Sequence, residues 1–277
     1  KISGRPLVFD AFTSLYGTFV ADRKFVERGS WKAKLLHTVD KWSCRLADMI
    51  LVDTDQHIDY FNNMFKIGKR KLRRIFVGAD EDIFYPRVNR KNNNFLVLFY
   101  GTFIPLHGIE YIIKAAKQLE KYKDIKFQII GSGQTSWYIE QLSEELRVNN
   151  VLFIEEWVPY KTMPEYIARA DICLGIFGNT KKAKMVIPTK VFQALAMKKP
   201  IITGDSPAAR EALTDRENAV LCTMADAEAL AESTLLLKQN KKLREKIAEN
   251  SYKLFKEKFS LKVIGIEVRR ILQELTN

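Results

Sequence analysis

Cysteine is scarce in this chain. Its 277 residues include three, Cys44, Cys173 and Cys222, which lie far apart in apolar contexts. They lack the close pairing of a zinc site, and a disulfide between any two would leave the third unpaired. The pattern argues against a disulfide-built scaffold and predicts reduced core cysteines in a cytoplasmic protein.

Long apolar runs are missing as well. No stretch approaches the roughly 20 apolar residues that a membrane-spanning helix requires, and the opening KISGRPLVFD has no signal-peptide core. We therefore expect a chain that does not cross a membrane.

Acidic residues are outnumbered by basic ones, 33 to 45, so the formal net charge is +12. The excess lies in KIGKRKLRR (66–74), KKAK (181–184) and KQNKKLREK (238–246). Such a surface attracts nucleic acid, anionic lipid or a phosphorylated small molecule, although solvated helix faces account for most of these lysines. Zinc-finger spacing, an RNP-like strand and a helix-turn-helix are missing, so nucleic acid is not expected, whereas anionic membrane lipid stays open as a partner.

Hydrophobic residues are plentiful, at 47% of the chain, and they form strand-like runs that alternate with helical patterns. The predicted strands are 6–10, 48–53, 72–77, 95–100, 126–131, 151–154, 171–175, 200–203 and 219–222. The predicted helices are 31–47, 54–65, 108–122, 135–147, 161–169, 188–197, 207–213 and those after Asp226. This alternation predicts an α/β fold with parallel strands and crossover helices.

The alternation is interrupted by VGADEDIFYPRVNRKNNN (77–94), which is typical of an interdomain linker. After it, the regular spacing predicts one complete doubly wound, Rossmann-like domain. Before it, three strands make too small a sheet to cover themselves, so we expect a partial second Rossmann-like domain with a segment missing upstream.

The first of three strand-to-helix turns is GTFIPLHG, from Gly101 to Gly108. Gly101 allows a close backbone approach, and the free amides near Gly108 can bind an anion without any side chain. His107 can donate to a phosphate oxygen. The alternative is a surface turn in which His107 packs or faces solvent, and we favour the ligand interpretation.

The second turn, IIGSGQ, contains Gly131 and Gly133 after a buried strand. These glycines leave room beside a ligand, but a tight strand-to-helix connection explains them equally well.

The third turn leads from FGNTKKAKMVIP into the helix TKVFQALAMKK. Pro188 suits the helix start, and Thr189 and Lys190 follow in the first turn, where a hydroxyl and an ammonium beside free amides can hold a phosphate. Gln193 lies on the same side of the helix, within reach of a ribose hydroxyl.

Other polar residues carry weaker signals. The acids at 80–82 and 155–156 lack partners for metal or acid-base work, and His37 and His57 lack neighbouring metal ligands. We interpret the acids as solvated and both histidines as structural.

Taken together, these segments resemble the nucleotide-sugar-dependent glycosyltransferases of family 4, which have the two-domain GT-B fold. ADMILVDTDQHIDYF and LRRIFVGADEDIFYP match the end of the family's first domain and its linker, and 95–250 match its donor-binding domain. The resemblance implies an acceptor-side domain at 1–78, a linker at 79–94, a donor-binding domain at 95–259 and a helix at 260–277 that crosses back to the first domain.

The resemblance also implies a donor site. The segment from Gly101 to Gly108 would wrap the diphosphate, Gly131 and Gly133 would border the nucleotide, and Trp157 and Val158 would lie near the base. The phosphates and ribose would be faced by four residues around the start of the next helix: Pro188, Thr189, Lys190 and Gln193.

The chain departs from the family pattern in two places. Many members have arginine and lysine where this chain has Thr102 and His107, so the diphosphate charge would be met in part by Lys184 or Lys190. The family's two glutamates align with Met185 and Gln193, which leaves the donor sugar and the base open.

For the intact enzyme the resemblance implies retaining transfer of a sugar from a nucleotide diphosphate to an acceptor alcohol. No protein nucleophile, metal or cofactor is expected beyond the nucleotide-sugar co-substrate. The expected acceptor is a surface glycan or lipid-linked sugar at the cytoplasmic membrane face, with which the basic runs agree.

Three alternatives remain. A non-catalytic or truncated nucleotide-sugar-binding fragment fits the small first segment, and a sugar-nucleotide epimerase of the same fold is disfavoured because its paired acids cannot be placed. Nucleic-acid binding comes third.

Overall fold

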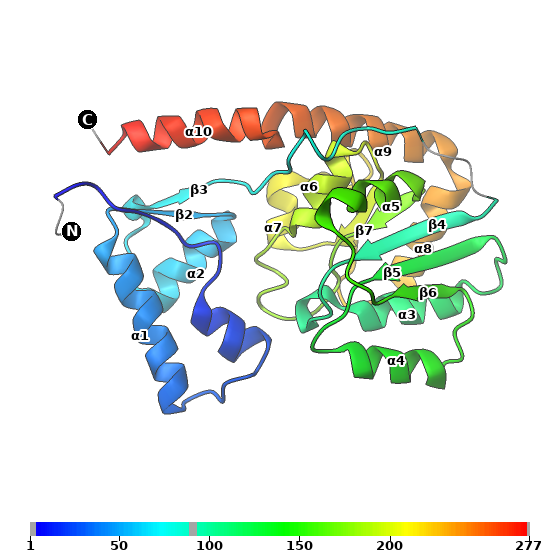
Figure 1. Cartoon of the computed structure of the whole chain (residues 1–277), viewed down its shortest axis with the longest axis horizontal. Helices are drawn as coiled ribbons and strands as arrows, with labels where there is room; N and C mark the ends of the chain where they lie inside the picture. The colour runs from blue at the N-terminus through cyan, green and yellow to red at the C-terminus, as the bar shows by residue number, and fades with distance from the viewer. Residues whose placement is uncertain (1–3, 89–92, 276–277) are drawn as a thin grey trace.

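A computed structural model describes residues 4–88 and 93–275 and forms two lobes joined by extended chain (Figure 1). Residues 89–92 of the predicted linker and 276–277 of the predicted last helix lie outside the described residues. The smaller lobe holds β1 (Val8–Asp10), α1 (Trp31–Leu46), β2 (Met49–Val52), α2 (Asp55–Phe65) and β3 (Leu72–Arg74).

Ala79 and Phe84, within the predicted linker, already pack in the core of the larger lobe. Its strands are β4 (Phe95–Tyr100), β5 (Ile125–Ile130), β6 (Val151–Ile154), β7 (Ile172–Leu174), β8 (Ile201–Gly204) and β9 (Val220–Cys222). Its helices are α3 (Ile109–Gln118), α4 (Ser136–Glu145), α5 (Met163–Arg169), α6 (Thr189–Ala196), α7 (Pro207–Ala212), α8 (Ala227–Gln239) and α9 (Lys241–Leu254).

Both sheets are parallel, as the alternation predicts. The small sheet has the order β1-β2-β3 and the large sheet β6-β5-β4-β7-β8-β9. In the large sheet the chain moves outward from β4 on one side and then from β7 on the other, so the strand order reverses between these two neighbours. In open α/β sheets, the carboxyl end of such a reversal is where ligands bind. The predicted α/β fold class is confirmed.

The large sheet is covered on both faces. Alternate residues of β4 face opposite ways: Val97 and Phe99 pack with α3 and α8, while Leu98 and Tyr100 pack with α5 and α6. Strands buried on both faces explain the unbroken apolar run at 95–100. Cys173 and Cys222 lie in these cores and Cys44 in the small one, all as free thiols, which confirms the prediction of core cysteines.

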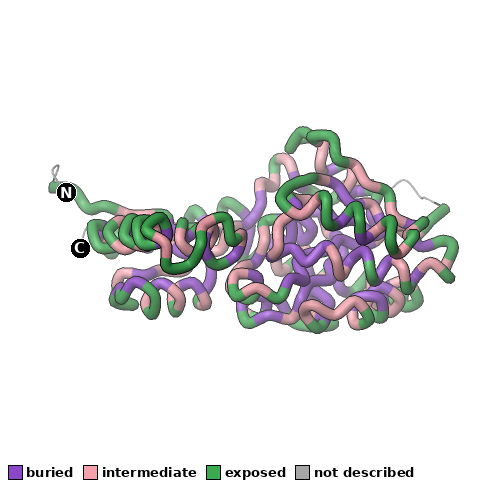
Figure 2. The backbone as a smooth tube through the Cα atoms, turned by 90° about the horizontal axis from the view of Figure 1, so that it is seen from below, coloured by how far each residue is buried: buried purple, intermediate pink, exposed green. Residues whose placement is uncertain are grey.

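The small lobe buries less. Its core is built on Ile50, Phe61 and Phe65, and the far side of α1 leaves Trp31 and Trp42 70% and 54% exposed. Figure 2 shows the difference, with buried backbone concentrated in the large lobe.

The end of the chain runs along both lobes. After α9 a π-helical turn (Phe255–Phe259) leads into α10 (Leu261–Gln273), which extends above β3 in Figure 1. Glu274 accepts from Arg73 at 2.9 Å, and Ser260 caps α10 by accepting from the Val263 amide. No helix in the described parts of the chain is both long and apolar enough to cross a bilayer.

Several details differ from the sequence prediction, two of them in the small lobe. A π-helical turn at Gly17–Asp22 was not predicted, and the strand expected at 72–77 ends at Arg74. Phe76 leaves the sheet because its ring packs against Phe192 and Phe259 of the large lobe, at 6.4 and 5.1 Å between centroids.

Candidate functional site

A cleft of about 330 Å³ lies where the carboxyl ends of both sheets meet. The small lobe contributes the residues after β1 and β2, and the large lobe contributes the residues after β4, the turn before α3 and the start of α6. The lining residues are Phe12, Thr13, Asp53, Tyr100, Gly101, Leu106, His107, Lys182, Val186, Ile187, Pro188, Thr189, Lys190 and Gln193. This is the switch point of the large sheet, where a ligand is expected.

Lys190 is the central cation of the cleft. It occupies the first turn of α6 and is buried, with its Nζ 3.8 Å from the centroid of the Phe99 ring and 3.5 Å from His107 Nε2. Burial lowers the pKa of Lys190 well below its usual value. Across residues 4–88 and 93–275, Lys190 has no ion pair with a carboxylate. An anion in the cleft would favour its charged form.

His107 stands beside this lysine. Its Nδ1–H donates to the Thr102 carbonyl at 2.5 Å, so the neutral ring turns its Nε2 toward Lys190. Burial, and then the charge of Lys190, hold the pKa of His107 well below its usual value. His107 is therefore a neutral acceptor here, and it can donate to a phosphate only if the bound anion first recruits a proton to Nε2.

The start of α6 is open. Pro188 occupies the N-cap position and makes no side-chain cap bond, so amides of the first turn face the cleft without a side-chain acceptor. Gln193 uses its Oε1 to accept from the Tyr100 hydroxyl at 2.9 Å, which leaves the donor end of its amide for a ligand.

Glycine is needed where Lys190 passes Gly101. That residue has φ 142°, and a Cβ built on it would lie 2.8 Å from Lys190 Nζ. Gly108, with φ 63°, would meet the Gly178 amide at 2.4 Å. Both positions keep the turn pressed against its neighbours.

The remaining predicted donor residues do not line the cleft. A Cβ on Gly131 would meet the Gly101 carbonyl at 2.2 Å, and one on Gly133 the Phe103 carbonyl at 2.8 Å, so both glycines serve backbone packing. Thr102 and Lys184 are exposed. Trp157 is 84% exposed and Val158 is half-buried, and their contact with a base stays a prediction.

The structure adds cleft residues that sequence reasoning missed. Lys182, counted among solvated lysines, is half-buried and donates to Thr18 Oγ1 at 2.7 Å. Burial lowers the pKa of Lys182, while the nearby carboxylates of Asp22 and Asp53 act in the opposite direction. The only signal in the sequence was the spacing of Lys182 and Lys184, which are two residues apart in one turn. At that spacing one side chain can face inward while the other faces solvent.

The lobes are joined around the cleft by polar contacts. Thr54 Oγ1 donates to the Met185 carbonyl at 2.6 Å, and the Asp55 and Gln56 amides donate to Glu211 at 2.7 and 3.1 Å. Thr180 donates to Asp22 at 2.8 Å. The two walls are therefore held in register by the residues that flank the cleft.

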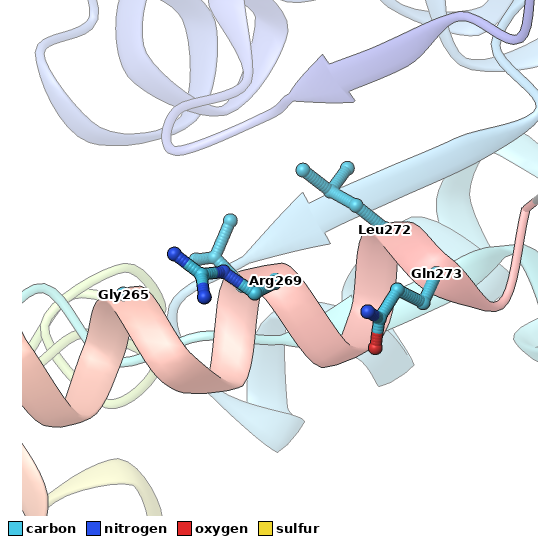
Figure 3. Close-up of a pocket in the computed structure, with 5 residues that line it drawn as sticks. Gly265, Arg269, Leu272 and Gln273 are labelled. Atoms are coloured by element: carbon cyan, nitrogen blue, oxygen red, sulfur yellow. The ribbon is translucent and has the colours of Figure 1, made fainter.

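A second hollow lies along α10. All its lining residues, Gly265, Val268, Arg269, Leu272 and Gln273, come from that one helix (Figure 3). It holds no constellation of groups that could do chemistry, so the interlobe cleft is the candidate site. Within the described ranges no three His, Cys, Asp or Glu side chains gather to hold a metal ion.

Comparison with known proteins identifies the class. Residues 80–254 match the family model of glycosyl transferases group 1, which covers more than half of the chain. The chain belongs to this family, and its fold is that of the GT-B glycosyltransferases.

Particular relatives are distant. An uncharacterized glycosyltransferase of Methanocaldococcus jannaschii is 28% identical over 211 residues, 76% of this chain and 55% of that protein. An alpha-D-kanosaminyltransferase of Streptomyces kanamyceticus is 21% identical over 99% of this chain and 72% of its own length. The match to the archaeal protein thus spans little more than half of that protein's length.

A solved structure agrees in fold. The HepE protein of Anabaena, in complex with UDP-glucose, superimposes with a TM-score of 0.80 at 17% identity, over 99% of this chain and 73% of that one. At this identity the likeness concerns the fold.

Proposed function

We propose that this chain binds a nucleotide-diphosphate sugar in the interlobe cleft and belongs to a retaining, family 4 type glycosyltransferase. The observation that carries the proposal is Lys190, a buried cation at the open N-terminus of α6, in a chain of the group 1 family. A diphosphate supplies the anion that this arrangement lacks. HepE, the neighbour in fold, was solved with UDP-glucose, which supports the same class of ligand.

The proposed chemistry uses the cationic wall to stabilise the leaving group. When the sugar departs, negative charge grows on the diphosphate, and Lys190, the half-buried Lys182 and the α6 amides face that charge. Because Lys190 is already desolvated, its interaction with the growing charge is stronger than in water. Gln193 would donate to the ribose, and no metal is needed in this scheme.

The acceptor is proposed as an alcohol of a surface or lipid-linked glycan. The net charge of +12 supports an acceptor presented on an anionic surface, with the enzyme peripheral to the cytoplasmic membrane face. Its binding site would lie on the small-lobe side of the cleft.

Thermal melting tests donor binding. The wild-type chain is heated with UDP, GDP, dTDP and their common sugar conjugates, and the ligand that binds the folded state raises the melting temperature. We expect one base to produce a shift, and Lys190→Ala and His107→Ala to reduce it. Lys242→Ala removes an exposed lysine that does not line the cleft and serves as the matched control.

Two further outcomes sharpen this test. Loss of the shift in Lys184→Ala would show that this exposed lysine also meets the diphosphate. No shift for the wild type with any probe rejects the proposed donor site, whereas binding without sugar transfer to any glycan acceptor favours the non-catalytic alternative.

A further inference from the structure

Asp53 is the one acidic side chain among the described residues that line the cleft. It follows β2 directly and belongs to the small lobe, opposite the wall that carries Lys190. Its residue is 4% exposed, yet it reaches the cleft surface. A buried carboxylate at the edge of a ligand cleft needs a structural or functional reason.

The carboxylate is held in place from behind. His57 Nδ1–H donates to Asp53 Oδ1, and the His57 ring packs edge-on against Tyr60 and Phe61, with centroids 6.4 Å apart in each case. His57 is itself buried, so its ring has little freedom to turn. One carboxylate oxygen is thus occupied and oriented, and the other is the group that Asp53 can present to a ligand.

The neighbouring residue ties Asp53 to the opposite lobe. Thr54 caps α2 by accepting from the His57 amide at 3.1 Å, and its hydroxyl donates to the Met185 carbonyl at 2.6 Å. Met185 lies in the loop that leads to α6, three residues before Pro188. Asp53 therefore sits beside the loop that forms the cationic wall, although it comes from a different domain.

The two walls favour different chemical groups. Lys190, Lys182 and the α6 amides are donors and attract phosphate, whereas a carboxylate repels phosphate and accepts hydrogen bonds from hydroxyls. A ligand in which a diphosphate is joined directly to a group rich in hydroxyls fits this polarity. The diphosphate and sugar of a nucleotide sugar are joined in that way.

We propose that Asp53 binds a hydroxyl group of the donor sugar, and that His57 is the positioning residue that holds its carboxylate. This inference rests on the proposed function and names a contact within the same site. Asp53 would distinguish a nucleotide sugar from the bare nucleoside diphosphate, and would contribute to the choice of sugar.

Calorimetric titration of the 277-residue chain tests the proposal. The probes are UDP, GDP and dTDP, each compared with its glucose, N-acetylglucosamine and mannose conjugates. We expect Asp53→Asn, which keeps the bond from His57, to weaken binding of the preferred nucleotide sugar by about 10-fold or more and not to weaken binding of its nucleoside diphosphate. Asp59→Asn, an exposed acid on α2, is the matched control.

The role of His57 has its own variants. His57→Asn places an amide donor near the position of Nδ1 and should retain the preference for the sugar conjugate, whereas His57→Phe should lose it while nucleoside diphosphate binding persists. Equal loss of both ligands in Asp53→Asn, or no loss of either, overturns the proposal. The proposal is also overturned if the wild type binds the nucleoside diphosphate and its sugar conjugates equally well. If the wild type binds no probe at all, the proposed function is rejected instead.

Discussion

Helix α6 has a buried lysine at each end, and the two are satisfied in different ways. Lys199, just after the helix, donates to the carbonyls of Ala168 and Ala170 at 2.7 and 2.8 Å. Lys190, in the first turn, faces the Phe99 ring and a histidine nitrogen instead. Burial lowers the pKa of both lysines. Lys199 therefore has a structural reason for being buried, whereas for Lys190 we propose a bound anion as the reason.

Two helix starts repeat this contrast. At α2 the amides of Asp55 and Gln56 are met by the Glu211 carboxylate of the other lobe. At α6 the N-cap Pro188 offers no side-chain acceptor. The protein supplies a carboxylate at the start of α2 and no side-chain cap at the start of α6, where we propose that a ligand binds.

The largest effect on the free protein is expected at Lys199. Lys199→Met leaves two buried carbonyls without a donor and should lower the free energy of unfolding in urea by about 1–3 kcal/mol. Lys190→Met removes a buried charge that has no acidic partner among the residues the structure describes, and it should leave that free energy unchanged or raise it. Nucleotide binding should respond in the opposite order, with loss only in Lys190→Met.

The proposed difference between the two lysines is wrong if Lys190→Met lowers the free energy of unfolding and Lys199→Met does not. A Lys190→Met chain that unfolds as readily as Lys199→Met would mean that Lys190 is structural. Circular dichroism during urea titration, at one pH for both variants, measures the difference.

A smaller effect on the free energy of unfolding is expected when pH falls, because of His107. Its pKa in the folded protein lies well below the unfolded value, so the native state binds fewer protons. Its contribution to stability is complete above about pH 6.5 and falls as pH drops below that value toward the folded pKa. Between pH 7.5 and 5.5 the wild type should lose about 1 kcal/mol more than His107→Asn, which keeps a donor for the Thr102 carbonyl but does not titrate. Parallel losses in urea titrations at the two pH values would contradict a neutral, buried ring.

The smallest effect is expected at the α2 start. Glu211→Gln keeps the size of the side chain but removes the charge that faces two amides and lies 3.5 Å from Arg74. We expect a loss of about 0.5–1 kcal/mol that shrinks in high salt. The Glu211→Gln loss should be similar at low and high salt if the carboxylate acts only through hydrogen bonds.

Much of the fold followed from local pattern. The run at 95–100 is apolar without interruption because β4 is buried on both faces, and Ser206 and Asp226 mark the starts of α7 and α8 by capping them. The turn at Gly17–Asp22 was missed because it has no apolar periodicity of its own. It is held by Ser14, which accepts from the Gly17 amide, and Asp40, which accepts from the Ser14 hydroxyl.

The candidate site was only half predictable. His107, Lys190 and Gln193 stand next to strand ends and a helix start, so local sequence marks them. Asp53 follows a strand too, but nothing local shows that it faces a cleft formed with residues more than a hundred positions away. Its partner His57, one helical turn later, was interpreted as structural for the same reason.

The sequence by itself determined the alternation of strands and helices and the three strand-to-helix turns, because periodicity and turn chemistry act over a few residues. Only the tertiary structure decided which lysine of the KKAK run turns inward, that Lys190 is buried against Phe99, and that Asp53 stands across from it. The burial of a side chain and the charges that lie opposite it depend on segments far apart in the chain. These two properties set the affinity and selectivity of a binding site.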